Sequence, residues 1–358
     1  MFGKKSFVGL DFGHHTIKVV QAERTPGGFK VVKAGWAPTP KDCIRDGIVT
    51  NVEAIAAVTK SVLRHAGVTC KDAIISVQGS TVVVRSVRMP KMSEAILRKS
   101  IRFEAGRYIP TSVEDSFVEF EILGDVDETQ MEVLIVAAPR DVVESRVKVC
   151  EELGMEVQVV DVSPFSSYRS LIEADYSRAW GDETFALIDL GAGGNNVSII
   201  SKSIFVMTRT ISQGNGSEFT EALRTFFDLS EEDAETGKSL LNVAELLDSK
   251  PTDNPPLRVL HPRLEELVRE IRRSINYYES QQVDGQQPMP VTSIVLTGGG
   301  AKLQGIDRYL SEKLGLPVTN LGIFSSPHFA NCTPHEFGAG LDLSVAGGLA
   351  IRPLMPAA

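Results

Sequence analysis

Residues 8–20 read VGLDFGHHTIKVV, in which two apolar segments flank Asp11, Gly13, His14 and His15. The apolar segments contain β-branched residues, which are typical of strands. Backbone N–H groups in a tight turn form a concave anion site, and glycine lets a phosphate approach without a steric clash. A carboxylate beside the phosphates can hold Mg²⁺ through water. The stretch therefore predicts a β-hairpin whose turn binds phosphate.

The same plan occurs a second time, half a chain further on. Residues 185–200 read FALIDLGAGGNNVSII, and Asp189 follows the first aspartate by 178 residues. Gly191 stands two positions later, as the glycine does in the first copy. A single Asp-x-Gly is more often an ordinary turn closed by the aspartate side chain. Two copies at this spacing predict two similar lobes, each with a hairpin that points its turn at a common cleft.

A third element lies at residues 294–306, which read IVLTGGGAKLQGI. An apolar strand ends there in three glycines, and a helical pattern follows. The bare glycine backbone leaves room for a flat ligand. Two phosphate turns followed by such a loop resemble the actin-like ATPases, the group that includes sugar kinases, heat-shock proteins and actin. This resemblance implies an α/β fold with two lobes and a nucleotide between them.

Composition limits the class of protein. The chain of 358 residues is long for one ordinary core, and its net charge of −9, without a dense Lys or Arg run, argues against a general nucleic-acid binder. No apolar run approaches the about 18 residues that span a bilayer, and the N-terminus lacks the apolar core of a signal peptide. Four distant cysteines indicate a reduced protein without a cysteine-ligated metal: Cys43, Cys70, Cys150 and Cys332. We expect a cytosolic protein whose association with any membrane comes through a partner.

Strand and helix patterns divide the chain unevenly. Residues 82–162 alternate strand, helix, strand, strand, helix and strand, which indicates a compact α+β insertion. Residues 249–262 are Pro-rich and predict a loop before a long helix over 263–282. The expected division is a first lobe of 1–81 and 163–184 with a C-terminal helix at 336–358, an inserted subdomain of 82–162, and a second lobe of 185–335.

Several longer stretches carry a more specific resemblance. The segment KSIRFEAGRYIPTSVEDSFVEFEIL at 99–123, APTPKDCIRDGIVTN at 37–51 and EIRRSINYYESQ at 270–281 are similar to the PilM family of type IV pilus assembly. The resemblance covers essentially the whole chain and implies a two-lobed actin-like ATPase fold with an inserted, SHS2-like α+β subdomain in the first lobe. The related FtsA family of cell division shares that insertion but ends in a membrane-binding amphipathic helix. Because this sequence stops at Ala358, we expect the pilus family.

The resemblance implies ATP and Mg²⁺ as ligands, with Asp11 and Asp189 holding the metal, mostly through water. The implied nucleotide-binding residues are Asp11, Gly13, His14, His15, Thr16 and Lys18 in the first turn, Asp189, Gly191, Ala192 and Asn196 in the second, Glu235 and Lys238 near the ribose and adenine, and Gly298, Gly299 and Gly300 in the adenosine loop.

Three positions depart from the family pattern. Serines are usual where this chain has His14 and His15, and threonine is frequent where it has Asn196. A histidine can donate a hydrogen bond to a phosphate, but its bulk can also close the pocket. Arg272 and Arg273 similarly allow two interpretations, a helix beside the base or a solvated basic face. The sequence leaves both alternatives open.

The family resemblance implies a scaffold rather than a metabolic enzyme. Its expected partner is the cytoplasmic N-terminal peptide of a PilN-like inner-membrane protein, which would link the membrane platform to the assembly motor and other pilus proteins. Candidate walls of the docking site are 82–88, 92–109 and 117–122. A kinase needs a carboxylate base, and no motif here identifies one, so we expect at most slow ATP hydrolysis. A dehydratase activator would need cysteines for an iron–sulfur cluster. The remaining alternative is an FtsA-like, filament-forming division or secretion protein.

Overall fold

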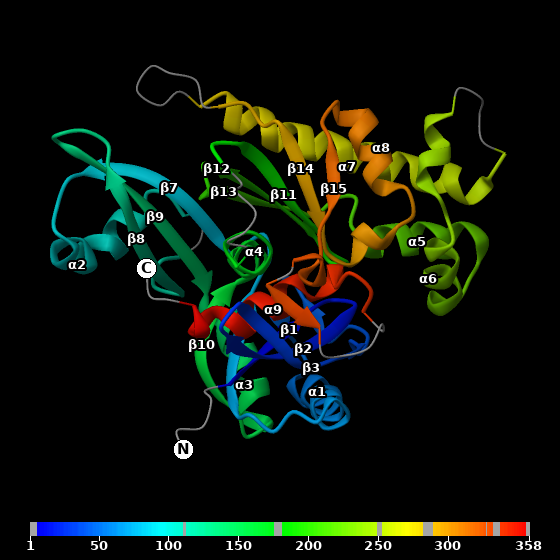
Figure 1. Cartoon of the computed structure of the whole chain (residues 1–358), viewed down its shortest axis with the longest axis horizontal. Helices are drawn as coiled ribbons and strands as arrows, with labels where there is room; N and C mark the ends of the chain where they lie inside the picture. Colours follow the sequence, from blue (N-terminus) through cyan, green and yellow to red (C-terminus); the bar gives the residue numbers. More distant parts are fainter. Residues whose placement is uncertain are drawn as a thin grey trace.

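A computed structural model describes most of the chain. The described residues are 6–109, 112–174, 181–248, 253–281, 289–326, 328–331 and 337–355. Two large sheets form the cores of two lobes, and a third, smaller sheet lies to one side (Figure 1). This arrangement confirms the two-lobed α/β architecture that the repeated Asp-x-Gly motif predicts.

The first lobe is built on a six-stranded sheet with the order β10-β6-β1-β2-β3-β16. Its strands are β1 (Phe7–Phe12), β2 (Thr16–Thr25), β3 (Gly28–Pro38), β6 (Asp72–Val77), β10 (Glu156–Val162) and β16 (Phe329–Asn331). A short hairpin of β4 (Ile44–Arg45) and β5 (Ile48–Val49) lies between β3 and the helix α1 (Val52–Ala66). Strand β1 is central and buried because it pairs with β2 on one side and with β6 on the other.

The second lobe repeats this topology in a five-stranded sheet with the order β13-β12-β11-β14-β15. Its strands are β11 (Thr184–Leu190), β12 (Asn195–Ser201), β13 (Ile204–Ile211), β14 (Ser293–Thr297) and β15 (Val318–Asn320). In both sheets the hairpin that carries the Asp-x-Gly turn is followed by an antiparallel third strand, and the first strand pairs in parallel with a later one. The two lobes are therefore copies of one supersecondary plan.

The small sheet has the order β7-β9-β8 and is covered by one helix. Its elements are β7 (Val83–Pro90), α2 (Glu94–Ala105), β8 (Ser116–Asp125) and β9 (Gln130–Pro139). The expected insertion of 82–162 is longer than this unit. Strand β10 pairs with β6 in the first sheet, and α3 (Arg140–Glu152) packs against α1 and β6. We propose that the inserted subdomain ends with β9.

The remaining helices cover the sheets and join the lobes. They are α4 (Ser163–Tyr168), α5 (Gly216–Phe227), α6 (Glu231–Ser239), α7 (Pro255–Glu279), α8 (Ile306–Leu314) and α9 (Ser344–Ile351). Helix α9 is buried along its whole length and packs against β1 and α4. A Cβ at Gly348 would lie 1.8 Å from the carbonyl oxygen of Ser166, so only glycine permits this close approach of the two helices. Figure 1 shows α4 and α9 between the two large sheets.

The loop predicted for the Pro-rich segment 249–262 is shorter in the structure, because a helix begins inside it. Helix α7 begins at Pro255, with prolines in its first turn and Pro262 inside it. Proline is tolerated in a first turn because the N–H that it lacks has no helical acceptor there. The prediction of a loop as far as residue 262 was therefore wrong from Pro255 onward, and residues 249–252 lie outside the described part of the chain.

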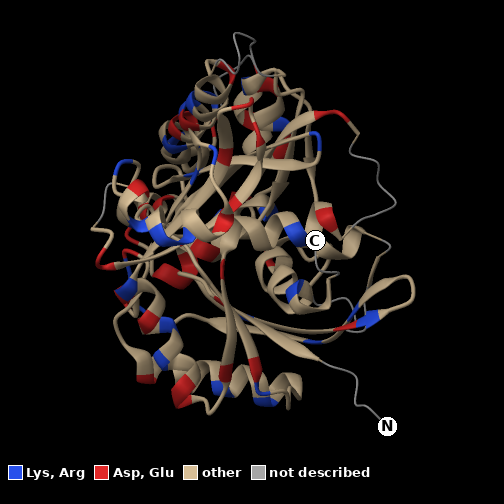
Figure 2. Cartoon of the chain, turned by 90° about the vertical axis from the view of Figure 1, so that its left-hand side faces the viewer, with Lys and Arg blue, Asp and Glu red and all other residues tan. Residues whose placement is uncertain are grey.

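The surface agrees with the acidic, mixed-charge composition. On the side that carries the inserted subdomain, basic and acidic residues are interspersed over the helices and strands (Figure 2). Within the described ranges, no helix combines the length and the hydrophobicity that crossing a bilayer would need. The expected C-terminal helix at 336–358 corresponds to α9 and packs in the first lobe, while residues 332–336, with Cys332, and 356–358 lie outside the described part.

Candidate functional site

The first phosphate turn joins β1 to β2. Asp11 and Lys18 are cross-strand neighbours, and Lys18 Nζ donates to Asp11 Oδ2 at 3.0 Å and to the carbonyl of Thr16 at 3.3 Å. Burial by itself would lower the pKa of Lys18, but the carboxylate of Asp11 outweighs burial and raises it. The turn closes through the N–H of Gly13, which donates to Thr16 O at 3.2 Å. Asp11, Gly13, Thr16 and Lys18 thus form one compact group.

The second turn joins β11 to β12 in the equivalent register. Asp189 lies opposite Asn196, as Asp11 lies opposite Lys18. Ser167 on α4 donates to Asp189 Oδ2 at 3.2 Å. Burial raises the pKa of Asp189 to about 6, and the negative charge of Asp11 adds to this effect. The two aspartates are therefore close enough to repel each other, as a shared cation site requires.

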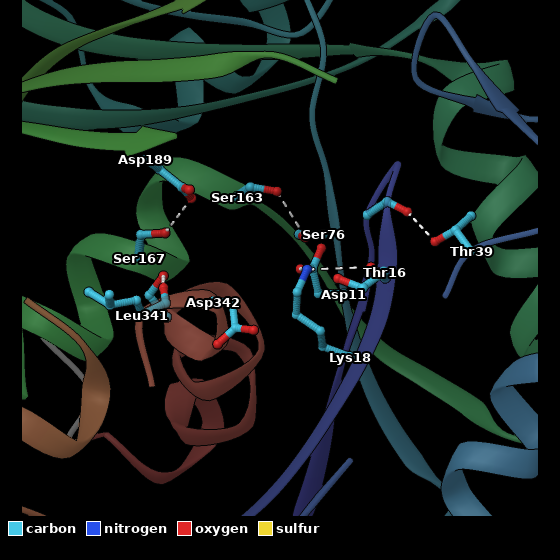
Figure 3. Close-up of polar contacts among 12 residues, drawn as sticks. Asp11, Thr16, Lys18, Thr39, Ser76, Ser163, Ser167, Asp189, Leu341 and Asp342 are labelled. Atoms are coloured by element: carbon cyan, nitrogen blue, oxygen red, sulfur yellow. Dashed lines mark hydrogen bonds and ion pairs between the residues drawn. The ribbon is translucent and has the colours of Figure 1, made fainter. Parts of the chain in front are cut away.

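The two turns face each other across the cleft. Figure 3 shows Asp11 and Lys18 on one side and Asp189 with Ser167 on the other, while Asp342 lies nearby. His14 reaches the second turn, because a Cβ at Gly193 would lie 2.3 Å from His14 Cγ. The imidazole therefore packs directly on the backbone of the opposite turn. Serine, with its shorter side chain, would leave this space open.

A second polar group lies where α5 meets α6. Lys238 Nζ donates to Glu235 Oε2 at 2.7 Å, to Thr220 Oγ1 at 2.8 Å and to the carbonyl of Gly216 at 3.1 Å. His15 Nε2 lies 3.8 Å from Glu235 Oε1. Since His15 belongs to the first turn and Glu235 to the second lobe, this contact spans the cleft. Glu235 and Lys238 are thus held beside the phosphate turns.

The three glycines of the adenosine loop have different surroundings. Gly298 has φ of +88°, and a Cβ there would lie 2.3 Å from Asp189 Oδ1. A Cβ at Gly300 would lie 2.7 Å from the side chain of Leu190, whereas one at Gly299 would meet nothing within 4 Å. Gly298 and Gly300 therefore let the loop pack on β11, and Gly299 presents open backbone of the kind that a flat ligand could cover.

Other expected residues make hydrogen bonds or ion pairs within the protein. Asn196 is buried and accepts a hydrogen bond from Thr210 of the neighbouring strand at 3.0 Å. The carbonyl of Ala192 accepts from the N–H of Ser217 at 3.0 Å, which anchors the second turn to α5. Arg272 donates to the carbonyl of Lys313. Arg273 is exposed and pairs with Glu270, which supports the solvated interpretation of this basic pair.

Sequence reasoning missed three polar residues that line or support the site. Ser167 binds Asp189, and the Thr39 hydroxyl donates to the carbonyl of Gly13 at 2.6 Å. Asp342 pairs with Lys302 at 2.6 Å and its charge acts on Lys18. The serine-rich run SPFSSYRS at 163–170 was the available signal for Ser167, because clustered serines beside a buried helix are unusual.

The oxygen donors of this site suit a nucleotide that carries Mg²⁺. Among the described residues, no three His, Cys, Asp or Glu side chains lie close enough together to ligate a metal. Mg²⁺ keeps several waters and commonly takes one or two carboxylates plus phosphate oxygens. Asp11 and Asp189 would supply that pair of carboxylates. His14 is the exception to the fit, since its ring occupies the space between the turns.

The raised pKa of Asp189 predicts a pH-dependent stability. The carboxyl has a pKa of about 6 in the folded chain and an ordinary value near 3.8 when unfolded. At pH values between these two, the folded state binds a proton that the unfolded state has lost. This protonation increases the free energy of unfolding as the pH falls. We expect Asp189→Asn to raise the free energy of unfolding by about 2 kcal/mol near pH 7.5 and to abolish this gain. Urea unfolding without nucleotide, at about pH 7.5 and 5.5, measures the difference from the unsubstituted chain, and parallel pH profiles would contradict the prediction.

Comparisons with known proteins place this geometry in a family. The chain is 25% identical to the cell division protein FtsA of Streptococcus pneumoniae serotype 2 over 352 residues, which cover 87% of this chain and 74% of FtsA. It superposes on MreB5 of Spiroplasma citri bound to ADP with a TM-score of 0.53 at 13% identity, covering 98% and 97% of the two chains. This second likeness shows the fold alone, and it confirms the actin-like fold expected from the two turns.

A further solved structure is more similar. The "PilM-PilN type IV pilus biogenesis complex" matches with a TM-score of 0.82 at 26% identity, covering 98% of this chain and 98% of the other. The family model described as type IV pilus assembly protein PilM matches residues 9–354. Because that match extends over nearly the whole sequence, the chain belongs to the family of the type IV pilus assembly protein PilM.

Proposed function

We propose that the chain is a nucleotide-binding scaffold of type IV pilus assembly that binds the cytoplasmic N-terminal segment of a PilN-like inner-membrane protein. Its membership of the PilM family and its likeness to a solved PilM–PilN complex support this proposal. Such docking would hold the protein at the inner membrane through its partner and connect that partner to the assembly motor. ATP with Mg²⁺ is the nucleotide that the two turns suit, with at most slow hydrolysis and no kinase activity.

The observation that carries the proposal is an incompletely covered sheet face in the inserted subdomain. On β9, Leu134 and Ala138 are buried in a hydrophobic cluster that contains residues of both lobes. Their cross-strand neighbours on β8 are Glu121 and Phe117, which are exposed. The face that packs on the lobes at β9 therefore continues onto β8, where no described residue buries Glu121 or Phe117. A strand face that leaves a large aromatic side chain exposed in this way suits a partner.

Strand β8 also offers a sheet edge. It lies at one end of the small sheet, whereas the other edge strand, β7, packs against β13 of the second lobe. An extended peptide can add to such an edge through main-chain hydrogen bonds and place alternate side chains on the exposed face. Phe117 is 41% exposed, and the guanidinium of Arg140 lies 4.4 Å from its ring centroid at the junction with the first lobe. We infer that Phe117 is the aromatic anchor of the docking site.

The charges on β8 indicate what the docking segment contains. Glu119 and Glu121 follow Phe117 on the same exposed face, two and four residues further along the strand. A segment that carries apolar residues for Phe117 and a Lys or Arg two to four positions away would satisfy this face, because successive side chains on one face of a strand are two residues apart. This pattern can be compared directly with the N-terminal sequence of a PilN-like partner.

We expect Phe117→Ala to weaken binding of the partner peptide about tenfold, because buried aromatic anchors dominate binding energy at interfaces. The measurement is fluorescence anisotropy of a labelled N-terminal peptide from the PilN-like partner. Phe226→Ala is the matched control, since Phe226 is 67% exposed on α5 of the second lobe. Equal affinities of the two variants would remove β8 from the docking site. If neither variant nor the unsubstituted chain bound the peptide, the proposed function would fail.

A further inference from the structure

Arg146 on α3 is buried without an ion-pair partner. Its side chain is 1% exposed, and Nη1 donates to the carbonyls of Gly47 and, at 3.0 Å, Val142. Its Nε and Nη2 atoms are buried, and no described residue offers them a hydrogen-bond acceptor. Within the part of the chain that the structure describes, no Asp or Glu lies within ion-pair distance of this guanidinium. Three N–H groups therefore remain unused on a buried cation.

Such an arrangement is costly unless something completes it. Buried charges in proteins are normally paired, and buried donors without acceptors need an explanation. Burial lowers the pKa of Arg146 to about 10, and the nearby charge of Asp11 acts in the opposite direction. The guanidinium therefore stays charged at neutral pH. A buried, charged and half-satisfied guanidinium is the chemistry of a receptor for an oxyanion, which it can bind with two parallel N–H groups.

Arg146 is linked to the first phosphate turn through the segment that follows β3, and its charge acts on Asp11 and His14. The segment that follows β3 is attached to that turn, since the Thr39 N–H donates to His15 O at 2.9 Å and its hydroxyl donates to Gly13 O at 2.6 Å. The same segment continues into the β4–β5 hairpin, which is attached in turn to α3. There the N–H of Val49 donates to Ser145 Oγ at 3.1 Å.

The hairpin turn itself contacts the guanidinium. Gly47, whose carbonyl accepts from Arg146, has φ of +81°, so its conformation favours glycine. The charge of Arg146 also acts on His14, whose pKa is lowered by burial and then by this neighbouring cation, while Asp11 and Asp46 act in the opposite sense. His14 is therefore close enough to Arg146 for their charges to interact, and its ring lies on Gly193.

We propose that Arg146 is the receptor for a phosphate oxyanion behind the first phosphate turn, which the anion reaches when the ring of His14 leaves Gly193. The anion has two possible sources, the terminal phosphate of a bound nucleotide or free inorganic phosphate. For the nucleotide source the inference rests on the proposed function, whereas for orthophosphate it stands independently. The site would let the scaffold distinguish a nucleoside triphosphate from a diphosphate without a catalytic base.

The test compares Arg146→Met, Arg146→Lys and the control Lys148→Met, which removes an exposed cation from the same helix. Thermal unfolding and calorimetric titration with ATP–Mg²⁺, ADP–Mg²⁺ and orthophosphate separate the sources. We expect Arg146→Met to fold at least as well as the unsubstituted chain without ligand, because methionine leaves no unpaired buried charge. We also expect it to lose about 10- to 100-fold in affinity for ATP or orthophosphate, with little change for ADP.

The affinities of the variants support or overturn the role of Arg146 as an anion receptor. A loss of affinity that is confined to ATP identifies the terminal phosphate of the nucleotide as the bound anion. A loss of affinity for orthophosphate identifies free phosphate as the bound anion. If Arg146→Met and Lys148→Met bind ATP and orthophosphate as the unsubstituted chain does, the inference is wrong and Arg146 only joins α3 to the hairpin. If Arg146→Met does not fold, Arg146→Lys replaces it, because lysine keeps the charge but not the paired N–H groups, and an unchanged preference for ATP over ADP then overturns the inference. Failure of ATP and ADP alike to bind any variant would instead count against the nucleotide part of the proposed function.

Discussion

Replacing Asp161 by alanine is expected to lower the free energy of unfolding by about 3 kcal/mol. Its side chain at the end of β10 is 2% exposed and accepts from two guanidinium groups, Arg352 at 2.8 Å and Arg169 at 2.7 Å. Removing the carboxylate would leave Arg169 largely buried and without its closest counter-charge. Because Arg352 follows α9, the variant would also detach the C-terminal turn from the first lobe.

Urea unfolding of Asp161→Ala beside Asp125→Ala measures this effect. Asp125 pairs with Lys91 on the surface of the inserted subdomain, where both side chains are about half exposed. Exposed pairs contribute at most about 1 kcal/mol. If the two variants lost the same stability, the cost of burying Asp161 and its arginines would cancel their attraction, and the cluster would not hold the C-terminal segment.

The lobes could be predicted from the sequence because each depends on a local hairpin. Asp11 and Asp189 stand at the same place in two strands, and the cross-strand neighbours that follow are only seven residues away in each case. Local pairing of this kind is determined by turn length and strand alternation. The glycine loop is similarly local, since β14, the glycines and α8 are consecutive. The positions of these residues in the cleft follow from the repeated topology.

The boundary of the insertion depended on non-local pairing. Strands β6 and β7 are separated by a short glycine-containing turn and resemble a hairpin, yet they belong to different sheets. Strand β10 returns to β6 across the whole insertion, and nothing in its own residues shows which sheet it joins. Arg146 was missed for a related reason, because an arginine on an amphipathic helix normally faces solvent. The β4–β5 hairpin, which packs against α3, contacts its guanidinium and helps to bury it.

His14 is the residue whose role the sequence left open, and its position favours closure of the cleft. In the folded chain the ring packs on Gly193, and burial lowers its pKa, with the charge of Arg146 acting in the same direction. The ring is therefore neutral near pH 7 and occupies space that a phosphate would need. A nucleotide must displace it, and the free energy of displacement reduces the observed affinity.

We accordingly expect His14→Ser to bind ATP–Mg²⁺ more than tenfold more tightly than the unsubstituted chain, as measured by calorimetric titration. The same argument predicts a pH dependence. Since the pKa of His14 is lowered in the closed position, protonation favours the displaced ring, so the affinity of the unsubstituted chain for ATP should rise as the pH falls through about 6.5. In His14→Ser this rise should be absent.

His15→Ser is the matched control, because His15 is half exposed and touches Glu235 only at 3.8 Å. Its removal should change ATP affinity by less than about threefold, as exposed ion pairs contribute little. Weaker ATP binding by His14→Ser would show instead that the imidazole donates a hydrogen bond to the phosphate. In that case the ring would move from Gly193 onto the ligand, and the histidine would replace the family's serine as a phosphate-binding side chain rather than close the cleft.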